Sequence, residues 1–149
     1  MEVVTLAGEI PERVHIQMNG LKLEADLLHG QKTGVYLDQR ENYVAAGRWA
    51  RGRVLDCFTS NGGFALHAAE QAESVEAVDS SAGALATAEA NARANDIANV
   101  HFRQADVFEF LTGIEHKYSM VGPAPPAFAT SRPPSWGSAR GANDIQFAH

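Results

Sequence analysis

Short apolar segments alternate with amphipathic ones between residues 53 and 124 of the chain. Four segments have the length and residue types of strands: RVLDCF from residue 53, SVEAVD from 74, VHFRQAD from 100 and KYSMVGPA from 117. The stretches between them have helical spacing: GGFALHAAEQA, SAGALATAEANARAND and VFEFLTGI. Strand–helix alternation with short connections predicts an α/β fold, in which a parallel sheet carries helices on both faces.

The segment VHIQMNGLKLEADL, residues 14–27, predicts a β-hairpin ahead of this region. Asn19 and Gly20 form a dipeptide that favours a two-residue type I′ turn, because both residues tolerate a positive φ. Such a turn pairs apolar residues across the ribbon: Met18 with Leu21, Ile16 with Leu23, and Val14 with Ala25. These six side chains then share one face, as a half-buried antiparallel ribbon requires. We interpret the hairpin as scaffold.

Two of the predicted helices have recognisable ends. Asp38 is expected to cap a helix that runs to about Ala50 and stops at Gly52. Its predicted apolar face contains Val44, Ala45 and Trp49. Ser80 or Ser81 is expected to cap the helix that begins near residue 81. The apolar face of that helix is made of Ala84, Leu85, Ala88 and Ala92. Trp49 and the phenylalanines are most simply explained as core residues.

Composition limits the classes of function. A chain of 149 residues can form one domain with a core, and 45% hydrophobic residues is ordinary for a soluble globular protein. The formal net charge is −6, and no basic patch stands out, so this segment is not expected to hold a nucleic acid by itself. No apolar run approaches the ~18 residues of a membrane span. The single cysteine, Cys57, fits a cytoplasmic location, and the scattered histidines predict no metal site.

Three aspartates, Asp56, Asp79 and Asp106, fall where predicted strands end. In doubly wound sheets, ligands bind beyond the carboxyl ends of the strands. Gly62 and Gly63 follow the first acid and let the backbone approach a ligand at the start of a helix. Asp79 follows Asp56 by roughly 20 residues, the distance at which an acid accepts hydrogen bonds from ribose hydroxyls in nucleotide-binding sheets. Asp106 is expected to reach an adenine amino group.

Each acid taken alone is better explained as a helix N-cap or a solvated turn residue, and only the set of three reverses that interpretation. A dinucleotide-binding fold needs G-x-G-x-x-G directly after the first strand, so that the pyrophosphate meets the helix N-terminus. This chain has DCFTSNGG there instead. The acid-first pattern favours a ligand with a cationic amino-acid end and no phosphate, such as S-adenosylmethionine, over a nicotinamide dinucleotide.

The stretch QKTGVYLDQREN, followed by RVLDCFTSNGGFALHAA, resembles the RlmI-type family of S-adenosylmethionine-dependent methyltransferases, which modify cytosine C5 in 23S ribosomal RNA. The resemblance implies a Rossmann-like class I methyltransferase fold, S-adenosylmethionine as cofactor and ribosomal RNA as partner. It implies that residues 1–33 are a β-hairpin and linker like the end of the family's central domain. Residues 34–149 are then the N-terminal, cofactor-binding half of a methyltransferase domain, with an irregular tail over 123–149.

The resemblance also implies roles for individual residues. Asp56, Phe58 and Gly62 match the motif I cofactor loop, Asp79 matches the ribose acid, and Asp106 with its neighbour Val107 matches the adenine side. An upstream motif, which lies close to the cofactor in the family, matches Gln31, Lys32, Thr33 and Arg40. Thr33 and Arg40 are assigned to cofactor binding, while the individual roles within this motif stay open.

Two departures from the family concern the chemistry. The family has a sequence like IVLDPPAF after the fourth strand, whereas this chain has MVGPAPPAF. Pro125, Pro126 and Phe128 match the loop on the substrate side, but Ala124 replaces its aspartate, and Gly122 and Pro123 replace strand residues. The later strands that complete the family's sheet are missing, so the predicted sheet is incomplete. The downstream cysteine that attacks cytosine C6 is missing as well.

Methylation at cytosine C5 needs a thiolate that first adds to C6. Cys57 is a poor candidate, because a buried strand position and the adjacent Asp56 both raise the pKa of a thiol. We therefore assign no catalytic residue. Two functions stay open: the cofactor-binding portion of an RNA methyltransferase, or a catalytically inactive fragment that only binds S-adenosylmethionine. A four-stranded open sheet also leaves an apolar edge uncovered, which predicts self-association.

Overall fold

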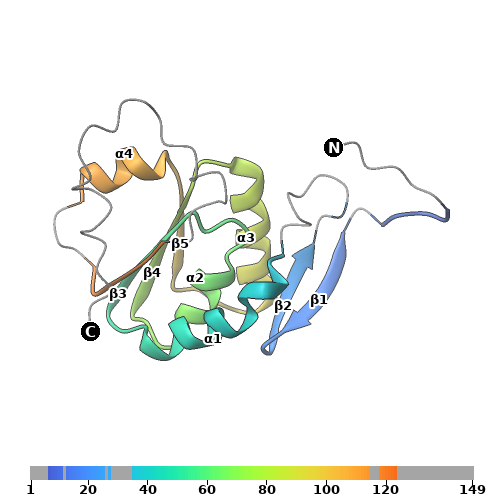
Figure 1. Ribbon diagram of the computed structural model, residues 1–149, viewed down its shortest axis with the longest axis horizontal. Coiled ribbons are helices and arrows are strands. Elements are labelled where there is room, and N and C mark those ends of the chain that lie inside the picture. Colours follow the sequence, from blue (N-terminus) through green and yellow to red (C-terminus); the bar gives the residue numbers. More distant parts are fainter. Residues whose placement is uncertain (1–6, 12, 26, 28–34, 115–117, 124–149) are drawn as a thin grey trace.

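The computed structural model describes residues 7–11, 13–25, 27, 35–114 and 118–123, and Figure 1 shows the arrangement of its helices and strands. The elements in chain order are β1 (Val14–Met18), β2 (Leu21–Ala25), η2 (Leu37–Gln39, a 3₁₀ turn), α1 (Arg40–Trp49), β3 (Arg53–Cys57), α2 (Gly63–Ala68), β4 (Ser74–Asp79), α3 (Ala82–Ala94), β5 (Val100–Gln104), α4 (Val107–Thr112) and β6 (Met120–Pro123). The predicted α/β fold, a parallel sheet preceded by a hairpin, is confirmed.

The hairpin has the predicted register. β1 and β2 are antiparallel, and the three apolar pairs expected across the ribbon are all present. Asn19 and Gly20 have φ values of 52° and 87°, which is the positive φ that a type I′ turn demands. Met18, Leu23 and Ala25 are buried in the main core, so the hairpin is docked against the rest of the domain.

The four-stranded sheet is parallel, with the order β5-β4-β3-β6. The chain fills one side of β3 with β4 and β5, and then returns to the other side of β3 as β6. The order therefore reverses beside β3, and crevices at such a switch point are where α/β sheets bind ligands. Gly122 and Pro123 do not break β6, because they pair with Asp56 and Cys57 of β3.

Alternation along the strands divides the core into two layers. Val54, Val75 and Ala77 belong to a cluster that also contains buried residues of the hairpin, α1, α2 and α3. Leu55 and Cys57 belong to a second cluster, in which Val107 and other residues of α4 take part. Helices therefore cover both faces of the sheet, as predicted, although α4 is the only helix of the described residues on its side (Figure 1). Within the described ranges, no helix is long and apolar enough to cross a membrane.

The predicted apolar face of α1 is wrong. Its buried residues are Tyr43 and Gly47, whereas the Trp49 side chain is 79% exposed. The reason is the close approach of α2, since a Cβ at Gly47 would lie 2.8 Å from the backbone oxygen of His67. Glycine lets the helices touch there, and this contact turns Trp49 outward. Asp38 does not cap α1 either, because the turn η2 precedes the helix and its N-cap is Gln39.

The other helix predictions fare better. Ser81 caps α3 by accepting a hydrogen bond from the backbone N–H of Ala84, which decides between the two predicted serines. Leu85, Ala88 and Ala92 are buried on the predicted face. Phe108 is an exception to the expectation that the phenylalanines are core residues, because it is 53% exposed on α4.

Self-association stays a prediction, and the sheet gives it a physical basis. β6 pairs with β3 along one edge, and its other edge has no partner strand in the part of the chain that the structure describes. Unpaired backbone groups on an edge strand favour pairing with another chain. We expect sedimentation velocity to show an average mass that rises with protein concentration. A single monomeric species at all concentrations would contradict this expectation.

Candidate functional site

The carboxyl ends of β3, β4 and β5 meet at one end of the sheet, and the three predicted aspartates are found there. The backbone N–H of Thr59 donates to Val78 O at 3.1 Å, which joins the chain after β3 to the end of β4. The N–H of Ala105 donates to Asp79 O at 3.0 Å, which joins the ends of β4 and β5. Asp56, Asp79 and Asp106 therefore lie at the same end of the sheet, as predicted from the sequence.

Asp56 is the most unusual of the three, because its side chain is 2% exposed. Its Oδ2 accepts hydrogen bonds from Thr59 Oγ1 at 2.7 Å and from the Ala65 N–H at 3.0 Å. Its Oδ1 is buried and has no hydrogen-bond partner among the described residues. Burial raises the pKa of this carboxyl to about 7, and the charge of Asp79 adds to the rise, although the two hydrogen bonds oppose it. A buried carboxylate with an unpaired oxygen favours a nearby cation.

Asp79 is half-buried at the end of β4, and both of its oxygens are oriented by backbone groups. Oδ2 accepts from the Ser60 N–H at 2.9 Å, and Oδ1 accepts from the Ser81 N–H at 2.9 Å. A carboxylate offers about four lone-pair sites, so two acceptor sites are left for hydroxyl donors. Asp106 is the N-cap of α4, where its Oδ1 accepts from the Glu109 N–H at 3.0 Å. The N-cap interpretation thus holds for Asp106, and its second oxygen leaves acceptor capacity.

The loop from Phe58 to Gly62 connects β3 to α2 and has a strained backbone. Phe58, Ser60 and Gly62 have positive φ values of 60°, 51° and 88°. Such a φ is uncommon outside glycine and costs on the order of 1–3 kcal/mol per residue. The loop keeps this shape because hydrogen bonds hold it, among them the Thr59 and Ser60 contacts with β4 and the bond from the Gly62 N–H to Thr59 O at 2.8 Å.

The glycines at the end of the loop and at the start of α2 are required by packing as well as by ligand access. A Cβ at Gly63 would lie 2.6 Å from the Tyr43 ring, so that position must be glycine for α1 to pack. Gly62 combines a positive φ with close contact to Ala88, where a Cβ would lie 3.2 Å from the Ala88 methyl. The predicted part of Gly62 in holding a cofactor stays a prediction beside these structural ones.

Phe58 extends the site from β3 toward α4. Its half-buried ring meets the Phe108 ring edge-to-face, with the centroids 5.5 Å apart. Val107 is 2% exposed in the second core cluster with Leu55, Cys57 and Val78, so it packs the start of α4 against β3 and β4. The predicted residues Phe58 and Val107 therefore lie around the same end of the sheet as the three acids.

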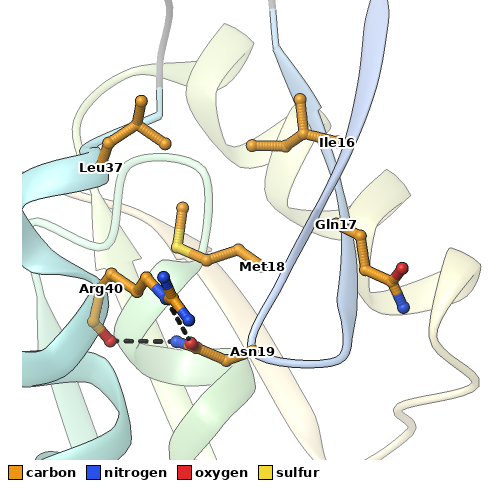
Figure 2. Close-up of a pocket in the computed structure, with 6 residues that line it drawn as sticks. All are labelled: Ile16, Gln17, Met18, Asn19, Leu37 and Arg40. Atoms are coloured by element: carbon orange, nitrogen blue, oxygen red, sulfur yellow. Dashed lines mark hydrogen bonds between the residues drawn. The ribbon is translucent and has the colours of Figure 1, made fainter.

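Arg40 lies elsewhere, at the start of α1 and against the hairpin turn. Its Nε donates to Asn19 Oδ1 at 3.1 Å, and its backbone oxygen accepts from Asn19 Nδ2 at 3.0 Å (Figure 2). It helps to line a hollow of about 420 Å³ together with Ile16, Met18 and Leu37 (Figure 2). No hydrogen bond or ion pair among the described residues joins Arg40 to the three acids, and its assignment to cofactor binding stays a prediction. Gln31, Lys32, Thr33, Ala124, Pro125, Pro126 and Phe128 lie outside the described residues.

The structure supports the argument against Cys57 as a nucleophile. Its side chain is 1% exposed, and burial raises the pKa of the thiol to about 12, with the charge of Asp56 adding to the rise. A thiol with that pKa supplies almost no thiolate at neutral pH. As for metals, no three His, Cys, Asp or Glu side chains gather as a ligand set in the ranges that the structure describes.

Sequence reasoning missed Asn91 of α3, which is 2% exposed and touches the loop after β3. Its Nδ2 donates to Asn61 O at 3.0 Å, between the two positive-φ positions Ser60 and Gly62. The signal was present in the sequence, because Asn91 shares a helical face with Leu85, Ala88 and Ala92. A polar residue on an otherwise apolar face needs a buried partner.

Comparisons with known proteins agree with this geometry. A protein-family profile described as "Methyltransferase domain" matches residues 50–120. Ribosomal RNA large subunit methyltransferase I of Shewanella denitrificans is 40% identical over 148 residues, which cover 94% of this chain and 37% of that protein. The protein of the same name from Photobacterium profundum is 42% identical, with the same shares covered. The resemblance to the RlmI-type family is confirmed, and the chain spans 37% of the length of these relatives.

Solved structures have the same fold. A Streptococcus mutans protein described as a SAM-dependent methyltransferase is 30% identical and matches 72% of this chain and 30% of its own, with a TM-score of 0.65. A crystal structure of a methyltransferase-type protein in complex with SAH matches equally well, with the same identity, shares and TM-score. Trm5b from Pyrococcus abyssi is 26% identical, with a TM-score of 0.70 over 86% of this chain and 37% of its own. The class I methyltransferase fold predicted from the sequence is thereby confirmed.

The buried carboxyl of Asp56 makes stability depend on pH. Its folded-state pKa of about 7 lies above the ordinary value of 3.8. The carboxyl therefore favours the unfolded state progressively as the pH rises from about 4 to about 7. The loss reaches on the order of 4 kcal/mol, because each tenfold change in proton affinity between the folded and unfolded states corresponds to about 1.4 kcal/mol. We expect Asp56→Asn to abolish this part of the pH dependence in urea unfolding between pH 4 and pH 8.

Glu73→Gln is the matched control, because it removes one acid at an exposed position just before β4. Its pH profile should follow that of the wild type. The unpaired amide nitrogen in Asp56→Asn adds a penalty that does not change with pH, so the difference in slope is the informative quantity. Parallel profiles for the wild type and Asp56→Asn would contradict a raised pKa at this site.

Proposed function

We propose that this chain binds S-adenosylmethionine at the carboxyl ends of β3, β4 and β5, as the cofactor-binding portion of an RNA cytosine-C5 methyltransferase. The single observation that carries the proposal is the buried Asp56 carboxylate, whose Oδ1 lacks a partner among the described residues at the point where the strand order reverses. A cationic amino-acid end is the ligand chemistry that such a group favours. S-adenosylmethionine has that end, and when bound it supplies the methyl group for transfer.

The other groups at this end of the sheet suit the rest of the molecule. The Asp79 carboxylate, held by two backbone N–H groups, keeps acceptor sites for a vicinal diol such as that of a ribose. Asp106 lies one strand further along, with acceptor capacity for an amino group. Phe58 provides an aromatic surface between β3 and α4. Asp56, Asp79 and Asp106, on successive strands, thus suit the cationic end, the ribose diol and the base of S-adenosylmethionine in that order.

Ribosomal RNA as the substrate rests on the name of the relatives and on the motifs shared with them. We propose that this chain alone binds the cofactor and does not transfer a methyl group to cytosine. Cytosine C5 chemistry needs a thiolate, and the single cysteine of the sequence, Cys57, is buried with a raised pKa. The loss of the loop aspartate at Ala124 points the same way. A cytoplasmic location stays a prediction.

A nicotinamide dinucleotide is the competing ligand. The loop after β3 disfavours this ligand. The strained turn Phe58–Gly62 leads into α2, which has only six residues, so the helix N-terminus offered to a pyrophosphate is that of a short helix. The buried Asp56 carboxyl also stands after β3 in place of the glycines that let a backbone approach a pyrophosphate. Titration with both NADH and S-adenosylmethionine distinguishes a dinucleotide-binding site from a site for S-adenosylmethionine.

We expect isothermal titration calorimetry to give a micromolar Kd for S-adenosylmethionine, and no binding of NADH. Asp79→Ala should weaken S-adenosylmethionine at least tenfold, because the diol loses charge-assisted hydrogen bonds worth about 1.5–3 kcal/mol each. Glu73→Ala is the control, since it removes an exposed acid at the opposite end of β4. Thermal unfolding of each variant establishes that the protein tested is folded.

Three results would overturn the proposal. They are no binding of S-adenosylmethionine by a folded wild type, equal weakening by Asp79→Ala and Glu73→Ala, or tighter binding of NADH. Methyl transfer to an RNA by the wild-type chain alone would contradict the narrower claim that this chain binds the cofactor without catalysis.

A further inference from the structure

The buried amide of Asn91 joins two parts of the molecule that are far apart in the sequence. On one side, its Nδ2 donates to Asn61 O at 3.0 Å in the loop after β3. On the other side, its Oδ1 accepts from the backbone N–H of Glu24 in β2 at 2.8 Å. Both partners are backbone groups with fixed roles, one an acceptor and the other a donor. Only one orientation of the amide satisfies both, so the Asn91 side chain is locked in place.

The hydrogen bond from Asn91 reaches the loop at its strained backbone segment. Asn61 lies between Ser60 and Gly62, both with positive φ. β3 and β4 hold the loop at Thr59, which bonds to Asp56 and Val78, and at Ser60, which bonds to Asp79. The Asn91 contact holds it from α3, on the side of the hairpin. Losing a hydrogen bond to a buried carbonyl costs about 1–3 kcal/mol, which is comparable with the strain that the loop must sustain.

The hairpin contact belongs to a wider attachment. One turn further along, at the end of α3, Asn95 Oδ1 accepts from the Lys22 N–H at 2.8 Å, and Asn95 Nδ2 donates to Lys22 O at 2.7 Å. The two asparagines thus hydrogen-bond to the backbone of Lys22 and Glu24, which are two residues apart on β2. No hydrogen bond among the described residues joins Asn95 to the loop, however, and the remaining bond of its side chain is to Asn91 O. Of the two asparagines, only Asn91 spans the distance from hairpin to loop.

A second path connects the hairpin turn to the end of the same loop. His67 of α2 makes a hydrogen bond from Nδ1 to Gly63 O at 2.7 Å, so Nδ1 carries the proton. Its Nε2 is then the acceptor for Asn19 Nδ2 at 3.0 Å. Gly63 directly follows the loop, and His67 is 8% exposed. The hairpin is therefore attached at both ends of the segment Asn61–Gly63 through buried side chains.

We infer that Asn91 is a positioning residue for the cofactor loop, and that through it the β1–β2 hairpin is part of the cofactor site. The inference rests on the proposed function, because it assigns the loop to S-adenosylmethionine. If docking of the hairpin favours the binding-competent loop, then by linkage the ligand must favour docking of the hairpin by the same factor. The hairpin then acts as more than scaffold.

Asn91→Asp tests the inference with little change of shape. A carboxylate keeps an acceptor for the Glu24 N–H, but it places an oxygen opposite Asn61 O, where the amide donated. Asn95→Asp is the matched control, with the same substitution on the same helix at a residue that touches β2 but not the loop. We expect Asn91→Asp to weaken S-adenosylmethionine about tenfold or more at pH 8, and Asn95→Asp to stay within about threefold of the wild type.

Amide hydrogen exchange gives a readout that does not need a ligand. Without ligand, exchange at Ser60 and Gly62 should be at least fivefold faster in Asn91→Asp than in Asn95→Asp. With S-adenosylmethionine, exchange at the Glu24 amide should slow in the wild type and not in Asn91→Asp. Should Asn91→Asp fail to fold, Asn91→Leu, which cannot be ionised, takes its place in the same comparisons.

The outcomes separate this inference from the proposed function. A folded wild type that does not bind S-adenosylmethionine overturns the proposed function, and the exchange at Ser60 and Gly62 still decides whether Asn91 holds the loop. Binding by the wild type with equal Kd values for the two variants overturns the inference alone. Equal exchange rates at Ser60 and Gly62 in the two variants overturn it as well.

Discussion

The site depends on how the loop between β3 and α2 is held in a conformation that its sequence does not favour. Three of its five residues have a positive φ, and two of these three are not glycine. Hydrogen bonds hold the loop at three successive residues. The buried Asp56 bonds to Thr59, Asp79 bonds to Ser60, and Asn91 bonds to Asn61. Strain that persists because its surroundings determine it is a feature of binding sites. The sheet, α3 and the hairpin therefore all contribute to one short stretch of backbone.

The fold was predictable where the rules are local. Hairpin register follows from the Asn19–Gly20 turn and from alternating apolar residues, and each predicted pair is present. The parallel sheet follows from strand–helix alternation. Because the strands are parallel, the acids at their carboxyl ends lie at the same end of the sheet. Even the segment with Gly122 and Pro123 forms the fourth strand, because β6 lies at an edge where a missing N–H is tolerated.

The features that were missed depend on contacts between distant segments. The face of α1 is set by where Gly47 meets α2, and this contact turns Trp49 outward. The place of Arg40 is set in the same way, because Asn19 holds it beside the hairpin turn, and its assignment to cofactor binding stays a prediction. The buried state of Asn91 was visible in its helical phase, but its two partners lie at Glu24 and Asn61. Periodicity indicates that such a residue is buried and leaves its partners undetermined.

The proposed site for S-adenosylmethionine lies at the carboxyl ends of β3, β4 and β5. A nuclear magnetic resonance titration of this 16.0 kDa chain tests it most directly, because each backbone amide reports its own position. Binding at these strand ends should give the largest chemical-shift changes at residues 58–62, 79–81 and 106–107. Changes around the hollow lined by Ile16, Leu37 and Arg40, which the hairpin helps to form, should be smaller than those at the strand ends. Changes centred on that hollow, or none at the strand ends under saturating ligand, would contradict this site.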